Sequence, residues 1–124
     1  MSNDPLGMMA GLAAIQATGK AGRLETGEIV FQSWGYSMVL PTWWKVLKGA
    51  KVGGFAIIQQ LEAEIVSHDG YGQAGVKRPT AQLSAHYPAE RRKVTSRNGV
   101  LMVGTQYGAA TVWDGKPKGF DTYD

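Results

Sequence analysis

The main chemical feature of the sequence is a concentration of basic side chains in its second half. Residues 77–97 contain six lysines and arginines but only one acidic residue, Glu90. Lys45, followed by Lys48 and Lys51, forms a second basic cluster, although the net charge of the chain is only +3. The rest of the chain is therefore net acidic. A charge separation of this kind creates a local field that attracts polyanions.

Aromatic residues interleave with the basic ones, and this combination is typical of proteins that contact a nucleic-acid backbone and stack on its bases. An alternative stays open, in which the tryptophans form the core and the run 91–93 is a strand edge protected by charge. On the first interpretation, the predicted nucleic-acid-binding residues are Lys77, Arg78, Arg91, Arg92, Lys93, Arg97, Lys45, Trp34, Tyr36 and Trp43.

Catalytic and metal-binding patterns are weak. His68 and Asp69 are adjacent, as a base and its orienting carboxylate can be, but neighbouring strand residues point to opposite faces and a polar turn is favoured. Residues 70–75 fit Gly-x-Gly-x-x-Gly, yet Pro79 follows too closely for the helix that this motif requires. Glu62 and Glu64 share a strand face, which suits solvated carboxylates. The chain also contains no cysteine. Because none of these patterns has the context that catalysis or metal binding needs, we expect a protein that is not an enzyme and needs neither cofactor nor metal.

The elements that must position these residues are predicted to be strands. Glycine makes up 17 of 124 residues, which favours tight turns over long helices. Asn98–Gly99 between two strand-like runs is the signature of a type I′ hairpin. The sequence predicts an all-β, mainly antiparallel fold, a small SH3-like barrel of five or six strands. The expected strands are 28–36, 43–48, 52–66, 93–97, 100–104 and 109–113, and 68–89 is expected to be mostly loop.

Residues 1–26 are predicted to be a short N-terminal helix and a linker, because Asp4–Pro5 resembles a helix start. Its apolar face suits a partner groove or self-association into a homo-oligomer. The uncharged apolar stretch within it, residues 5–18, is too short to span a membrane. The barrel is expected over 27–115, with a loosely held polar tail at 116–124. The predicted partner-binding residues are Met8, Met9, Leu12 and Ile15.

Several short motifs resemble a family of small uncharacterised bacteriophage and plasmid proteins. They are Gly27-Glu-Ile-Val, Ser33-Trp-Gly-Tyr, Trp44-Lys-Val-Leu, Arg91-Arg-Lys-Val and Val112-Trp-Asp-Gly-Lys-Pro, within residues 27–123. The chain departs from the family at 37–41, where Ser-Met-Val-Leu-Pro replaces a polar turn. The resemblance implies a mobile-element origin and brings no activity with it.

Two hypotheses follow from these features. The first is a non-catalytic nucleic-acid-binding barrel of a phage or another mobile element, acting in the cytoplasm of a bacterial host. The second is a protein-binding factor: an inhibitor of a host defence complex or a small virion component. Charge alone does not separate them, since a basic protein can also occupy the acidic surface of a partner protein.

Overall fold

The computed structural model describes residues 22–36, 38–71 and 73–122, and every strand in these ranges pairs antiparallel with its neighbours. The prediction of an all-β antiparallel fold is confirmed. The predicted N-terminal helix, including Met8, Met9, Leu12 and Ile15, lies outside these ranges. The strands are β1 Arg23–Leu24, β2 Ile29–Trp34, β3 Leu40–Lys48, β4 Ala50–Lys51, β5 Phe55–His68, β6 Ala74–Leu83, β7 Glu90–Arg97, β8 Val100–Thr105, β9 Gly108–Val112 and β10 Lys118–Asp121.

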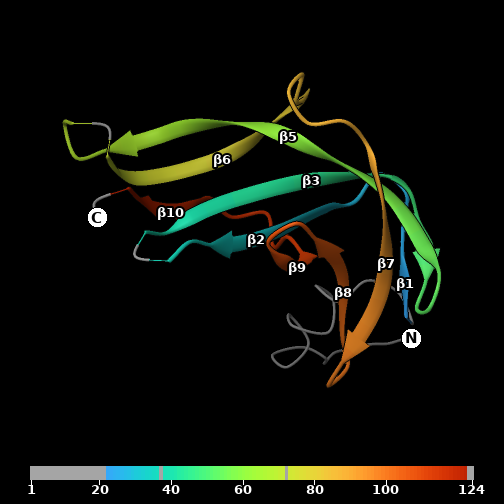
Figure 1. Ribbon diagram of the computed structural model, residues 1–124. Coiled ribbons are helices and arrows are strands. Elements are labelled where there is room, and N and C mark those ends of the chain that lie inside the picture. The colour runs from blue at the N-terminus through green and yellow to red at the C-terminus, as the bar shows by residue number, and fades with distance from the viewer. Residues whose placement is uncertain (1–21, 37, 72, 123–124) are drawn as a thin grey trace, which may run out of the picture.

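Six of these strands form a closed ring. The order within the main sheet is β10-β6-β5-β3-β2-β9-β8-β7, and an additional pairing joins β7 back to β5. Strands β5, β3, β2, β9, β8 and β7 therefore each have a hydrogen-bonded neighbour on both sides (Figure 1). Closure of this kind leaves no exposed sheet edge within the ring.

The core fills this ring and comes from alternate strand positions. Trp44 and Val46 of β3 point inward, and exposed Lys45 lies between them. Ala56 and Ile58 of β5 and Val94 of β7 point the same way. Leu24 of β1 is only 1% exposed and belongs to this core, so the folded domain begins before the predicted boundary at residue 27.

A second layer lies against the outer side of β2 and β3. The second half of β5 continues beyond the ring and pairs with β6, and β10 adds to β6 (Figure 1). A bridge between Val39 and Asp121 ties β10 back to the start of β3. Between these elements lies Trp43, which contacts the rings of Phe31 and Trp113. The molecule thus has two packed layers that share β3 and β5.

The hairpin predicted at Asn98–Gly99 is confirmed. Both residues have positive φ, 52° and 80°, and β7 and β8 pair directly on either side of them. These are the backbone angles that a type I′ turn needs, and Asn and Gly adopt them with little strain.

Two other predictions were wrong. The stretch 68–89 contains the ten-residue strand β6, although Pro79 lies within it. Pro79 faces Ala63 of β5 but lies beyond the four residues of β6 that pair with β10, so β6 is an edge strand at this position, where proline is tolerated. The tail predicted to be loose at 116–124 contains β10, whose Phe120 is 4% exposed, so residues 118–121 of it are held in the sheet.

The turn that leads into β10 is held by polar contacts. Trp113 Nε1 donates to the Lys116 carbonyl at 2.8 Å, and the Lys116 amide donates to Asp114 Oδ1 at 2.9 Å. Lys118 Nζ donates to Asp114 Oδ2 at 2.8 Å. The bond from Lys118, followed by that from Lys116, lowers the pKa of Asp114 below its usual value. A lowered pKa means that these contacts stabilise the fold at neutral pH and are lost as the pH falls through that lowered pKa.

Within the described residues, no helix is long and apolar enough to cross a membrane.

We predict that Gly49→Ala destabilises the protein strongly. A Cβ at Gly49 would lie 2.1 Å from the Leu24 carbonyl oxygen, and the Gly49 amide donates to Thr26 Oγ1 at 2.9 Å. The backbone of the 24–26 segment would have to move, at a cost of about 2–3 kcal/mol in the free energy of unfolding. Gly104→Ala in β8 is the matched control, since a Cβ there meets nothing within 4 Å. Urea denaturation compares the two, and equal midpoints would contradict the expectation.

We also predict that Phe120 anchors β10. Phe120→Ala should lower the free energy of unfolding by about 3 kcal/mol, because it removes a buried aromatic side chain from between the layers. Phe120→Leu keeps most of the volume and should cost less than about 1.5 kcal/mol. Denaturation gives the energies, and hydrogen exchange of the amides of 118–121 should accelerate in the alanine variant alone. Unchanged exchange would mean that other contacts hold β10.

Candidate nucleic-acid interface

Basic side chains collect on the outer face of three adjacent strands, β3, β5 and β7. Strand β5 lies between the other two, since Ile57 is the register partner of both Lys48 of β3 and Arg91 of β7. One step along the ladder, Phe55 faces Lys93, and on the other side Gln59 faces Lys45. Directly opposed residues of an antiparallel pair share a face. We call this set the basic face: Lys45, Lys48, Phe55, Ile57, Gln59, Arg91 and Lys93.

The alternation of side chains along each strand explains why these residues point outward. Ala56 and Ile58 are buried in the core, so Phe55 and Ile57 of the same strand lie on the opposite side. In β7, buried Val94 lies between exposed Lys93 and exposed Thr95. The sheet itself therefore fixes where the cations stand.

Phe55 is the aromatic centre of the basic face. Its side chain remains 43% exposed although it is large and apolar. The Arg91 guanidinium lies over its ring, with Cζ 3.8 Å from the ring centroid. This cation–π contact holds the planar guanidinium in one orientation, with its other side available for a further planar group. The pair offers a stacking platform that also carries a positive charge.

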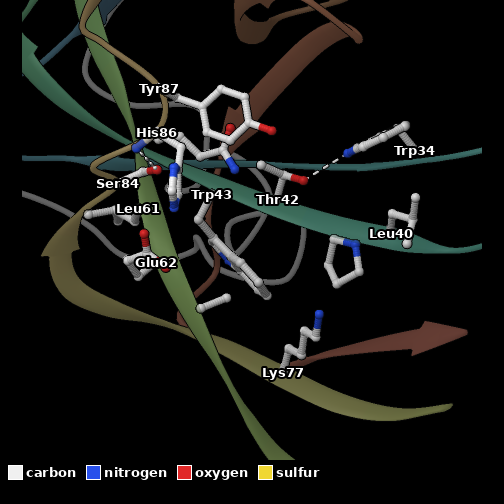
Figure 2. Close-up of a pocket in the computed structure, with 13 residues that line it drawn as sticks. Trp34, Leu40, Thr42, Trp43, Leu61, Glu62, Lys77, Ser84, His86 and Tyr87 are labelled. Atoms are coloured by element: carbon white, nitrogen blue, oxygen red, sulfur yellow. Dashed lines mark hydrogen bonds between the residues drawn. The ribbon is translucent and has the colours of Figure 1, made fainter. Parts of the chain in front are cut away.

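The three aromatic residues predicted to bind nucleic acid differ in how far they are buried. Trp43 is completely buried, so its predicted role as an exposed stacking residue is wrong. Trp34 is half-buried and stacks on Tyr107 at 3.7 Å between centroids, while its Nε1 donates to Thr42 Oγ1 at 2.7 Å (Figure 2). Tyr36 is fully exposed in the connection between β2 and β3, away from the basic face.

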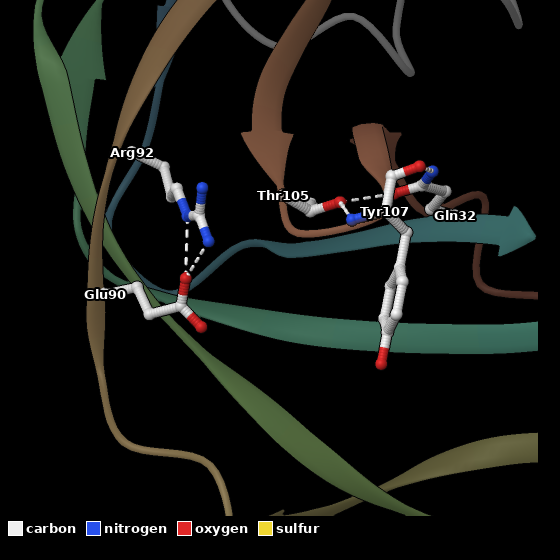
Figure 3. Close-up of polar contacts among 5 residues, drawn as sticks. All are labelled: Gln32, Glu90, Arg92, Thr105 and Tyr107. Carbon is white, nitrogen blue, oxygen red and sulfur yellow. Dashed lines mark hydrogen bonds and ion pairs between the residues drawn. The ribbon is translucent and has the colours of Figure 1, made fainter.

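The surroundings of Trp34 form a fixed polar network. Thr105 Oγ1 donates to Gln32 Oε1 at 2.5 Å, and Gln32 Nε2 donates to the Tyr107 carbonyl at 2.8 Å. The Tyr107 amide donates to Thr105 Oγ1 at 3.0 Å. These contacts join β2 to the β8–β9 turn (Figure 3). Trp34 and Tyr107 are therefore committed to structure rather than free to stack on a base.

Some of the cations predicted to bind nucleic acid are also engaged in contacts within the protein. Arg92 lies on the other face of β7 and binds Glu90 through both Nε, at 2.7 Å, and a terminal nitrogen (Figure 3). Arg78 binds Glu64 at 2.5 Å. Lys77 lies on β6 with its ammonium 4.8 Å from the Phe120 ring centroid. Arg97 is exposed at the hairpin end of β7, in step with Arg91 and Lys93.

The cations of the basic face form no ion pair within the described residues, although Arg91 lies over the Phe55 ring. Among the described residues, the ion pairs are Arg23–Glu25, Arg78–Glu64, Arg92–Glu90 and Lys118–Asp114, and none involves Lys45, Lys48, Arg91 or Lys93. The nearest acidic group along β7, Glu90, is already neutralised by Arg92. The uncompensated charge of this face therefore acts outward.

Sequence reasoning placed Lys45, Arg91 and Lys93 in the site. It named Lys48 in a basic cluster without making it a site residue, and it missed Phe55 and Ile57. The run Phe55-Ala-Ile-Ile58 is apolar at every position, so no alternation could reveal which members face out. The signal that could have found Phe55 is its place directly after Gly53–Gly54, where a strand begins.

Other chemistry finds little support in the described residues. No group of three or more His, Asp or Glu side chains there lies close enough to hold a metal ion. His68 and Asp69 cap the turn at the end of β5: His68 Nδ1 accepts from the Gly70 amide at 3.0 Å, and Asp69 Oδ1 accepts from the Tyr71 amide at 2.9 Å. Of the glycine motif at 70–75, Gly70 lies in this β5–β6 connection and Gly75 lies in β6, so a strand and not a helix follows the motif. The chain matches no protein-family model, no curated protein and no solved structure.

Proposed function

We propose that this chain is a non-catalytic nucleic-acid-binding protein that engages a single strand with its basic face. The observation that carries the proposal is the group of unpaired cations, Lys45, Lys48, Arg91 and Lys93, around exposed Phe55. Cations supply sequence-independent attraction to phosphates, and an exposed aromatic ring supplies base stacking. Neighbouring strands are spaced about 4.8 Å apart, so a face of three strands is about 10 Å wide, as a single-strand track requires.

The proposal includes two finer points from the sequence. The ring of six strands is compatible with a small SH3-like barrel, a type of fold that presents a sheet face to its ligand. The motifs from Gly27 to Pro117 support an accessory protein of a bacteriophage or another mobile element, acting inside the bacterial host. In that setting the protein would coat or capture host or phage nucleic acid rather than alter it chemically.

The first test removes three cations from the basic face. The variant Lys45→Ala/Arg91→Ala/Lys93→Ala should bind a fluorescein-labelled single-stranded oligonucleotide at least about tenfold more weakly at low salt. Four phosphate contacts give a slope of about −3 in a plot of log affinity against log salt, and the variant should retain about −1. Fluorescence anisotropy at several salt concentrations measures both quantities.

A matched control removes the same charge elsewhere. Arg23→Ala/Arg78→Ala/Lys116→Ala also reduces the net charge by three but leaves the basic face intact. We expect its affinity to stay within about threefold of the wild type, since contacts rather than net charge set the slope. If both variants lose the same affinity, net charge and not the basic face accounts for the binding. If the wild type does not bind the oligonucleotide at low salt, the proposed function is rejected.

The second test concerns stacking on Phe55. Phe55→Leu keeps an apolar side chain but removes the ring, and should weaken single-strand binding by about 1–3 kcal/mol. Phe55→Trp should restore or increase the affinity, because it enlarges the stacking surface. The salt slope should stay unchanged in both variants, since neither alters a charge. Tyr71→Ala is the control, as Tyr71 is 83% exposed but lies in the β5–β6 connection. Equal affinities for the leucine and tryptophan variants would exclude Phe55 from the interface.

A protein-binding role is the second candidate, and one surface favours it. Ile65 and Val66 are adjacent in β5, at a shift in the β5–β6 register, and they are 46% and 49% exposed. Tyr71 at the end of the same hairpin is also exposed. An exposed apolar hairpin end suits a host defence protein or a virion protein as partner. Loss of a captured partner on Ile65→Lys/Val66→Lys, with oligonucleotide binding intact, would support this role.

A further inference from the structure

A pocket of about 310 Å³ lies beside the basic face. It opens between β3, the middle of β5, β6 and the loop before β7, and Figure 2 shows its lining side chains. Trp43 in its wall and Lys45 of the basic face are two positions apart in β3, so they lie on the same side of the sheet. In β5, lining residues 60–63 follow Gln59 directly. A strand bound along the basic face therefore passes the mouth of the pocket.

The loop that forms one wall is tied to the sheet. The Ser84 amide donates to the Gln60 carbonyl at 2.8 Å, and Gln59 Nε2 donates to the carbonyls of Ser84 and Tyr87 at 3.2 Å each. The His86 amide donates to Ser84 Oγ at 3.1 Å. These bonds hold Tyr87, which is 39% exposed, at the pocket. The site is preformed rather than assembled by binding.

The polar groups of the pocket include acceptors without protein donors. Glu62 is half-buried, and its carboxylate takes part in none of the ion pairs of the described residues. Two further lining residues have buried polar atoms without a hydrogen-bond partner among the described residues: the acceptor Gln60 Oε1 and the donor Trp43 Nε1. Unpartnered buried polar atoms are rare in folded proteins. Both atoms are closed to solvent in this structure, so a polar ligand in the pocket reaches them only when the lining side chains move.

From this arrangement, which rests on the proposed single-strand function, we infer that the pocket binds a guanine base. Guanine carries two adjacent donors, N1–H and the N2 amino group, and a carboxylate accepts both at once. Adenine and cytosine place an acceptor beside their amino group, and it would face the carboxylate of Glu62. Uracil and thymine offer one N–H between two carbonyls. The O6 acceptor of guanine is then available for a donor of the wall, and Tyr87 provides a ring beside the base.

The experiment compares oligothymidylates that carry one central guanine, hypoxanthine, adenine or cytosine, using fluorescence anisotropy. We expect guanine to raise the affinity at least about tenfold over thymine. Hypoxanthine, which lacks only the N2 amino group, should lose most of that gain. Glu62→Gln and Tyr87→Ala should abolish the gain and leave oligothymidylate binding unchanged. The matched controls are Glu64→Gln, whose carboxylate binds Arg78 instead, and Tyr71→Ala.

Titration with guanosine monophosphate, followed by calorimetry, distinguishes the two sources of the base. Binding of the free nucleotide, lost in Glu62→Gln, would support the pocket with a mononucleotide as its ligand. Guanine-dependent oligonucleotide binding without binding of the free nucleotide would support a base presented within a strand. Equal affinities for all central bases, with no nucleotide binding, would overturn the inference. If the protein binds oligothymidylate with the same affinity whatever the central base, the proposed single-strand function still holds and only the guanine pocket is rejected. If it binds guanosine monophosphate but not oligothymidylate, the single-strand function is rejected and the guanine pocket still holds.

Discussion

The structure depends on the backbone pairing of one long strand, β5. Its 14 residues carry N–H and C=O groups that must find partners on both sides wherever the strand is covered. The first half obtains them from β3 and β7, which closes the ring, and the second half obtains them from β6. Shifts in the β5–β6 register at Leu61/Ala63 and Ile65/Ser67 accompany this second half, and such irregularities bend and twist a strand. The bend brings β6 and β10 against the outer side of β2 and β3.

The same constraint sets where charge can appear. A strand that is buried on one side turns every second residue outward, so the contiguous run Arg91-Arg92-Lys93 is divided between two faces. Arg92 shares a face with Glu90 and pairs with it, whereas Arg91 and Lys93 share a face with Phe55 and Ile57, which carry no charge. What reads in the sequence as one basic cluster is in the molecule one neutral ion pair and one positively charged surface. The Arg92–Glu90 pair is half-buried, and its formation decides which cations remain available to a partner.

Sequence patterns predicted the features that neighbouring residues determine. They failed for features that depend on contacts between segments distant in the sequence. The Asn98–Gly99 turn and the alternation of Trp44, Lys45 and Val46 could be read directly from the sequence. Strand β6 could not be predicted, because a proline such as Pro79 argues against a strand. Only the structure shows that the neighbouring strand, β10, ends before it reaches Pro79. Strand β10 could not either, since Phe120 is a lone apolar residue in a polar segment, and only the second layer explains its burial. For the site, the cations were visible in the sequence, but the burial of Trp43 and the exposure of Phe55 depend on which side of the ring each strand presents.

In the proposed function, the two layers divide the work that nucleic-acid binding requires. The ring presents cations and Phe55 on a surface that is open, where contacts are long-range, sensitive to salt and indifferent to the base. The second layer builds a pocket with carboxylate and amide groups, where contacts are short and depend on the donors that a base offers. Strand β5 runs through both, with Phe55 and Ile57 on the open face and Glu62 in the pocket. Because one continuous strand carries residues of both, the strand itself sets the distance between the basic face and the pocket. Under the proposal, a nucleic acid held on the basic face is presented to the pocket in a fixed register.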